Sequence, residues 1–75
     1  MLKPLQVLQA SIGKPITVEM RSETAFRGVL DGYDPHMNLV LKQAKEYYEG
    51  KEVETHTTAI LRGDGVIYIS RIEGE

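Results

Sequence analysis

Two short polar segments of the chain combine the residue types that can hold an exposed nucleobase. They are residues 34–38 (Asp-Pro-His-Met-Asn) and residues 61–64 (Leu-Arg-Gly-Asp). The imidazole of His36 and the guanidinium of Arg62 are planar and can stack on a base. The amide of Asn38 offers a donor and an acceptor to its edge. If the two segments lie side by side in the fold, together they form a pocket for one base.

Each segment also has a purely structural interpretation. Asp34 followed by Pro35 initiates turns, and Asn38 tolerates unusual backbone angles. Residues 62–65 (Arg-Gly-Asp-Gly) suit a tight hairpin in which glycine supplies a positive φ and Asp64 bonds to the backbone. For either segment taken alone, the structural interpretation is favoured. The presence of both segments in one chain raises the weight of the base-binding interpretation.

The spacing of apolar residues predicts a short helix followed by five strands. Pro4 suits the first helical position, Leu5 and Leu8 recur at helical spacing, and Gly13 is a natural stop, so the helix is expected within residues 3–12. From residue 15 onward the period changes to two. The strands are expected at residues 15–20, 25–33, 38–48, 52–61 and 66–72, joined by turns at 21–24, 49–51 and 62–65.

These elements predict a mostly β domain, a strongly bent five-stranded antiparallel sheet or open barrel spanning residues 15–72. Gly28 and Gly32 indicate a sharp bend or a close approach of two backbones in the second strand. The last strand is apolar on both faces, which is an aggregation hazard at a free sheet edge. Pairing with another subunit would cover it, and head-to-tail pairing closes into a ring. Residues 73–75 are expected to be a frayed tail.

Composition limits the class of protein further. Seventy-five residues make a single domain, 1–75, and the absence of cysteine fits a cytoplasmic protein without disulfides. No apolar run is long enough to span a bilayer, so no membrane partner is expected. The formal net charge of −2 counts against a duplex DNA binder, which neutralises many phosphates. The net charge does not count against binding of single strands, because base stacking supplies more of the binding energy there.

A catalytic or metal-binding function is not expected from these residues. The chain has no cysteine nucleophile, no glycine-rich phosphate loop and no His-x-x-x-His or Glu-x-x-His pair, so no cofactor and no metal are predicted. Asp31 and Asp34 differ by three along a strand, which sends their side chains to opposite faces. His56 stands among threonines and is interpreted as a solvent-facing or cross-strand residue.

Taken together, the motifs resemble the bipartite signature of the Sm and Sm-like (LSm) RNA-binding family. The matching residues are Gly28, Asp34, Met37, Asn38, Leu39, Leu41, Leu61, Arg62, Gly63, Asp64 and Val66. Residues 26–41 are similar to the archaeal Sm-like proteins in particular. The likeness runs from about residue 3 to residue 72, nearly the whole chain.

The resemblance implies the Sm fold, an N-terminal helix on a bent, SH3-like five-stranded open barrel. It implies rings in which the fourth strand of one subunit pairs with the fifth strand of the next, seven subunits in archaeal members. It also implies binding of single-stranded, uridine-rich RNA around the pore, in RNA processing or ribonucleoprotein assembly. A second RNA contact of some archaeal members maps to Lys3 and Tyr33.

The same resemblance assigns a role to each residue of the predicted pocket. His36 and Arg62 would stack on the two faces of the base. Asn38 would hydrogen-bond its Watson–Crick edge, Asp64 would orient Asn38, and Gly63 would supply backbone contacts.

Two alternatives remain beside this interpretation. A six-membered bacterial Hfq-like ring is disfavoured, because Hfq proteins use a different motif in place of residues 61–64. The other is an SH3-like module that recruits protein partners and has no RNA preference of its own. Such modules gather aromatic residues in a peptide-binding groove, whereas this chain has one Phe, four Tyr and no Trp, dispersed along the sequence.

Overall fold

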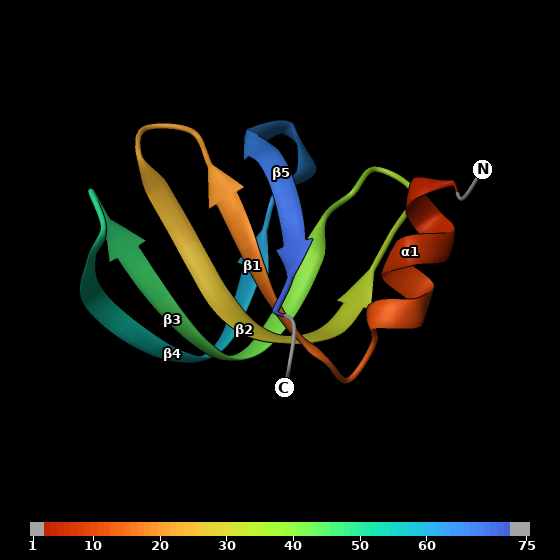
Figure 1. The fold of residues 1–75 in the computed structure, drawn as a ribbon, viewed down its shortest axis with the longest axis horizontal. Helices are drawn as coiled ribbons and strands as arrows, with labels where there is room; N and C mark the ends of the chain where they lie inside the picture. The colour runs from red at the N-terminus through yellow and green to blue at the C-terminus, as the bar shows by residue number, and fades with distance from the viewer. Residues whose placement is uncertain (1–2, 73–75) are drawn as a thin grey trace.

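A short helix lies at one end of a strongly bent five-stranded antiparallel sheet (Figure 1). The structure, a computed structural model, describes residues 3–72. Its elements are α1 (Pro4–Ser11), β1 (Pro15–Met20), β2 (Thr24–Tyr33), β3 (Leu39–Tyr48), β4 (Lys51–Leu61), a 3₁₀ turn η1 (Gly63–Gly65) and β5 (Val66–Arg71). The strands are ordered β4-β3-β2-β1-β5, which confirms the predicted fold class.

The element boundaries agree with the periodicity of the sequence to within one residue. The helix runs from Pro4 to Ser11 and not over the whole of residues 3–12, because Ile12 already has an extended backbone (φ −56°, ψ 132°). Gly13 follows with φ +80°, the left-handed conformation that favours glycine at a helix end. Residues 73–75, predicted to be a frayed tail, lie outside the described residues. Within residues 3–72, no helix is long and apolar enough to cross a membrane.

The core forms between the inward-facing residues of the bent sheet and the inner face of α1. Successive strand residues point to opposite faces of the sheet, so apolar residues at every second position all face this core. The buried apolar residues are Leu8, Ile16, Val18, Leu30, Leu39, Leu41, Ala44, Ala59 and Leu61. Leu39 directly follows the first polar segment and Leu61 is the first residue of the second, and the two pair with each other across β3 and β4.

The turn between β1 and β2 adopts left-handed backbone angles without a glycine. Ser22 and Glu23 have φ of 64° and 59°, a conformation that costs an L-residue about 1–2 kcal/mol. The carbonyl of Glu23 accepts a hydrogen bond of 3.0 Å from the N–H of Glu49 in the β3–β4 turn. This contact between the two turns holds the strained segment in place.

Gly28 and Gly32 differ in what surrounds them. A Cβ on Gly28 would lie 2.9 Å from the carbonyl oxygen of Lys42 and 3.1 Å from the Cα of Ala44, whereas one on Gly32 would meet nothing closer than Val40 at 3.9 Å. Register shifts in the β2–β3 pairing occur beside both glycines. The expected close approach of backbones is therefore found at Gly28. Gly32 lies beside a register shift, but a side chain could fit there without a clash.

The sheet order leaves β4 and β5 as edge strands among the described residues. Large apolar side chains are exposed on both: Ile60 on β4 is 73 % exposed, and Ile67 and Tyr68 on β5 are 61 % and 57 % exposed. Exposed apolar edges favour pairing with another chain.

We expect Gly28→Ala to lower the free energy of unfolding by about 1–3 kcal/mol, because the added methyl group has only backbone atoms to displace. Gly32→Ala on the same strand is the matched control, and its effect should lie within about 0.5 kcal/mol of the parent. Urea unfolding at one fixed protein concentration measures both. Equal effects of the two variants would contradict the close packing at Gly28.

Candidate nucleic-acid interface

Asp34 builds the loop between β2 and β3. Its carbonyl oxygen accepts a bond of 3.0 Å from the N–H of Met37, with Pro35 at the second position of the turn, where its fixed φ is suited. Its carboxylate Oδ1 accepts from the N–H groups of His36 at 2.9 Å and Asn38 at 3.0 Å. Met37 has φ of 66°, so the local bonds of Asp34 support a backbone that is strained for an L-residue.

The amide of Asn38 is held from both sides. Its Nδ2 donates to Asp34 Oδ2 at 2.9 Å, and its Oδ1 accepts from the N–H of Gly63 at 2.7 Å. A carboxylate can only accept and a backbone N–H can only donate, so the orientation of the amide is fixed. One N–H and one oxygen lone pair of Asn38 remain for a ligand.

Gly63 allows the two polar segments to touch. A Cβ at this position would overlap the carbonyl oxygen of His36 and lie 2.9 Å from the carbonyl carbon of Met37. The positive φ expected for glycine in this turn was wrong: neither Gly63 nor Gly65 has one, and residues 63–65 form a 3₁₀ turn. Glycine is required here for close approach and not for its backbone angles.

Arg62 and Asp64 project from the second segment into solvent. Their side chains are 82 % and 73 % exposed, and Arg62 Nη2 lies 3.4 Å from Asp64 Oδ2. An exposed pair of this kind contributes only about 0–1 kcal/mol, so the guanidinium is free to meet a ligand. The expected orientation of Asn38 by Asp64 was wrong, because Asp34 and Gly63 hold that amide.

The structure brings together all five residues of the predicted pocket. They line one shared surface depression: His36, Asn38, Arg62, Gly63 and Asp64. The juxtaposition of residues 36 and 62, which the sequence left conditional, is therefore present.

The proposed second contact is not assembled in the same way. Lys3 lines a depression with Pro35 and Met37, whereas Tyr33 lines another with Asn38 and Arg62. Tyr33 therefore belongs beside the main pocket. Asp34 was not among the predicted site residues, although its spacing of four from Asn38 was the signal that could have found it.

The electrostatics of the loop follow from its donors. The hydrogen bond from the Asn38 side chain lowers the pKa of Asp34 from its usual value of 3.8; desolvation opposes this, and the backbone N–H groups of Asn38 and His36 add to it. Asp34 thus stays ionised at neutral pH and keeps its acceptor role.

Comparison with known proteins decides the family. The model of the LSM domain matches residues 6–71. The chain belongs to the LSM domain family. An Sm-like protein of Archaeoglobus fulgidus is 43 % identical over 72 residues, covering 96 % of this chain and 94 % of the relative. This confirms the resemblance that the two motifs indicated.

Solved LSM-family structures share the whole architecture. The Sm protein of Pyrococcus abyssii in complex with a uridine heptamer superposes with a TM-score of 0.90 at 37 % identity, covering 95 % of this chain and 100 % of that one. The SmAP1 heptamer of P. aerophilum gives 0.89 at 35 % identity, covering 99 % of both chains. The chain therefore shares its overall fold with these solved structures over nearly its whole length.

We expect the carboxyl of Asp34 to titrate below 3.8, its usual value and that of the unfolded chain. Because the folded pKa is the lower one, this group stabilises the fold fully above pH 3.8, and that stabilisation is lost as the pH falls through the folded pKa. Carbon-detected NMR of the Asp34 side chain measures the pKa, and the side-chain amide resonances of Asn38 should move in the same step.

The variant Asp34→Asn is the control, because the coupled movement of the Asn38 resonances should vanish in it. A carboxyl of Asp34 that titrates at or above 3.8 would contradict the hydrogen-bonding described here.

Proposed function

We propose that this LSM-family chain binds single-stranded RNA and prefers uridine. The observation that carries the proposal is the fixed amide of Asn38, held between Asp34 and Gly63 with one donor and one acceptor free. Uracil presents an N–H flanked by two carbonyl oxygens, and a donor–acceptor pair of that edge complements the amide. Cytosine inverts part of this pattern, and a purine is wide for a pocket closed by two planar groups.

His36 and Arg62 are the proposed stacking groups. Both are exposed and share the depression with Asn38, so a base seated against the amide could contact both planar groups. Sequence-tolerant stacking contributes about 1–3 kcal/mol per base, and the fixed amide adds the discrimination. Asp64, paired with Arg62 at 3.4 Å, is proposed to restrain the guanidinium, and the backbone of Gly63 lines the pocket floor.

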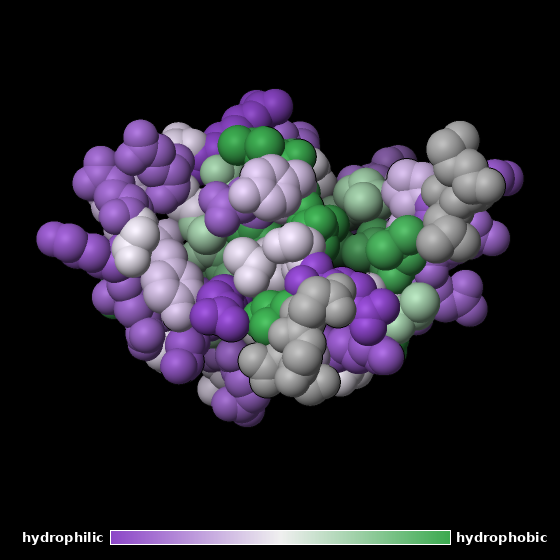
Figure 2. All heavy atoms as spheres, viewed as in Figure 1, coloured by the Kyte–Doolittle hydropathy of each residue, from purple (hydrophilic) through white to green (hydrophobic). Residues whose placement is uncertain are grey.

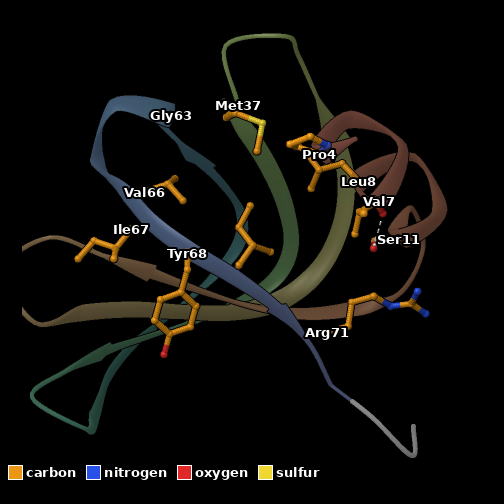
Figure 3. Close-up of a pocket in the computed structure, with 11 residues that line it drawn as sticks. Pro4, Val7, Leu8, Ser11, Met37, Gly63, Val66, Ile67, Tyr68 and Arg71 are labelled. Carbon is orange, nitrogen blue, oxygen red and sulfur yellow. Dashed lines mark hydrogen bonds between the residues drawn. The ribbon is translucent and has the colours of Figure 1, made fainter. Parts of the chain in front are cut away.

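We further propose that the chain assembles into a ring of seven through its edge strands. An apolar groove runs between α1 and β5, with Leu8 and Met37 at one side and Val66 and Tyr68 at the other (Figure 3). Figure 2 shows hydrophobic side chains gathered in the middle of this face, between polar ones. The β4 edge of a neighbour, with its exposed Ile60, supplies a strand for β5 and an apolar side chain for this surface.

The relatives support this assembly and ligand. The P. aerophilum relative is a heptamer, and the P. abyssii structure holds a uridine heptamer. A ring of seven copies would carry a formal charge of seven times −2, or −14, while presenting seven copies of Arg62 at the RNA pockets. A local positive field within an acidic exterior favours a threaded single strand over a duplex.

In this proposal the protein acts by binding, as a scaffold in RNA processing or ribonucleoprotein assembly in the cytoplasm, and it carries out no catalysis of its own. The bound RNA is organised around the ring, one base for each subunit.

Oligouridine should bind more tightly than oligoadenosine or oligocytidine. Arg62→Ala should weaken oligouridine binding by roughly 5- to 150-fold per contacted base, because it removes a stacking plane. Asn38→Ala should instead flatten the preference among bases. Fluorescence anisotropy with short labelled homopolymers measures these affinities.

Arg27→Ala is the matched control for loss of charge, because Arg27 is an exposed arginine of β2 remote in sequence from both polar segments. It should bind oligouridine as the parent does. Equal affinity for all homopolymers, or parental binding by Arg62→Ala, would discard the pocket.

Native mass spectrometry should give a ring of seven times 8.4 kDa, or about 59 kDa. Ile60→Asp should shift the protein towards smaller species, because a charge would enter the proposed subunit contact. Leu5→Asp, which places the same charge on exposed α1, should leave the ring intact. A stable 8.4 kDa monomer of the parent at micromolar concentration would rule out the ring, and a hexamer would favour an Hfq-like assembly.

A further inference from the structure

A second cluster of polar side chains lies on the β3–β4 hairpin, at the end of the sheet opposite α1 (Figure 1). It consists of Glu46, Glu54 and His56, whose ligand atoms all lie within 4.8 Å of one another. His56 Nε2 is 2.9 Å from Glu46 Oε1 and 4.0 Å from Glu54 Oε2. None of these residues takes part in the proposed RNA pocket.

The strand register places the three side chains on one face. Glu46 pairs directly with Glu54, and Ala44 pairs with His56, so the two carboxylates and the imidazole project to the same side as buried Ala44. Phe26, opposite Glu46 on β2, packs its ring 6.2 Å from that of His56. The cluster therefore lies on the inner side of the bent sheet, on the β3–β4 hairpin and away from α1.

Two carboxylates directly opposite each other on neighbouring strands repel and destabilise the pair. The side chains of Glu46 and His56 are only 29 % and 32 % exposed, whereas that of Glu54 is 67 % exposed. Two ligands are thus held by the fold, and the third is free to close on an ion that arrives from solvent. A dication would offset the repulsion more fully than the imidazole does.

We propose that Glu46, Glu54 and His56 bind a divalent transition-metal ion, with Zn²⁺ the best fit, one ion in each subunit. An imidazole nitrogen with two carboxylate oxygens is a donor set that suits zinc, whereas Mg²⁺ and Ca²⁺ prefer oxygen ligands alone. Tetrahedral zinc places its ligands about 3.3 Å apart. The ligand atoms here are separated by 2.9 Å, 4.0 Å and at most 4.8 Å, so rotation of the exposed Glu54 side chain would close the set around an ion. Water completes the coordination.

This proposal revises the expectation of a chain without a metal site. Glu46 lies eight residues from Glu54 and ten from His56, which matches no short metal-binding motif. Only the pairing of β3 with β4 brings them together. The proposal does not depend on the RNA-binding function, because it rests on different residues.

Isothermal titration of the untagged, chelator-treated full chain with zinc chloride tests the site. We expect one zinc per chain, and little or no heat with magnesium chloride. His56→Gln and Glu54→Gln should each weaken zinc binding about tenfold or more, because each removes a ligand. Native mass spectrometry should show the bound ion on the parent ring and its loss from both variants.

Two controls locate the ion. His36→Gln alters the only other histidine, and Glu52→Gln alters another exposed acid of β4; both should bind zinc as the parent does. Amide spectra check that every variant keeps the fold. Absence of zinc binding by the parent, parental affinity in His56→Gln, or equal loss in His36→Gln would each overturn the proposal.

Discussion

The hydrogen bond of 2.7 Å from the N–H of Gly63 to Oδ1 of Asn38 is the contact on which the candidate pocket depends. It joins two residues that lie 25 positions apart, and it helps to set the direction of the one side-chain amide among the residues lining the pocket. It also requires the Gly63 backbone to pass close to that of His36, where any side chain would overlap a carbonyl oxygen. Packing thus permits the bond, and the bond gives the pocket its pattern of donor and acceptor.

An acidic residue beside a proposed RNA site is at first sight unfavourable, because RNA is a polyanion. The carboxylate of Asp34 is nevertheless occupied by three donors, two backbone N–H groups and the Asn38 amide. Those bonds spread its charge over the loop and hold the pKa of Asp34 low. The negative charge of Asp34 therefore stabilises the conformation of the loop that forms the pocket, while Arg62 presents a positive charge at the surface.

The same sheet that positions the pocket also has two open edges within residues 3–72. Residues 39 and 61 begin β3 and end β4, so the polar segments emerge where these strands are paired and buried. The opposite ends of β3 and β4 carry the cluster of Glu46, Glu54 and His56. One pair of strands therefore separates two chemically different clusters of side chains, and apolar side chains are exposed on the edge strands β4 and β5.

The amino-acid sequence by itself determined the order of elements, and it named the candidate residues for holding a base, because periodicity and turn chemistry are local properties. It did not show which carboxylate holds the Asn38 amide. The sequence assigned that role to Asp64, whereas in the structure Asp34 accepts the hydrogen bond and Asp64 pairs with Arg62. It also gave no sign that Glu46 and His56 meet. Those facts depend on strand register and on close approach of backbones, which arise only when distant segments pack together, and so the tertiary structure alone decided them.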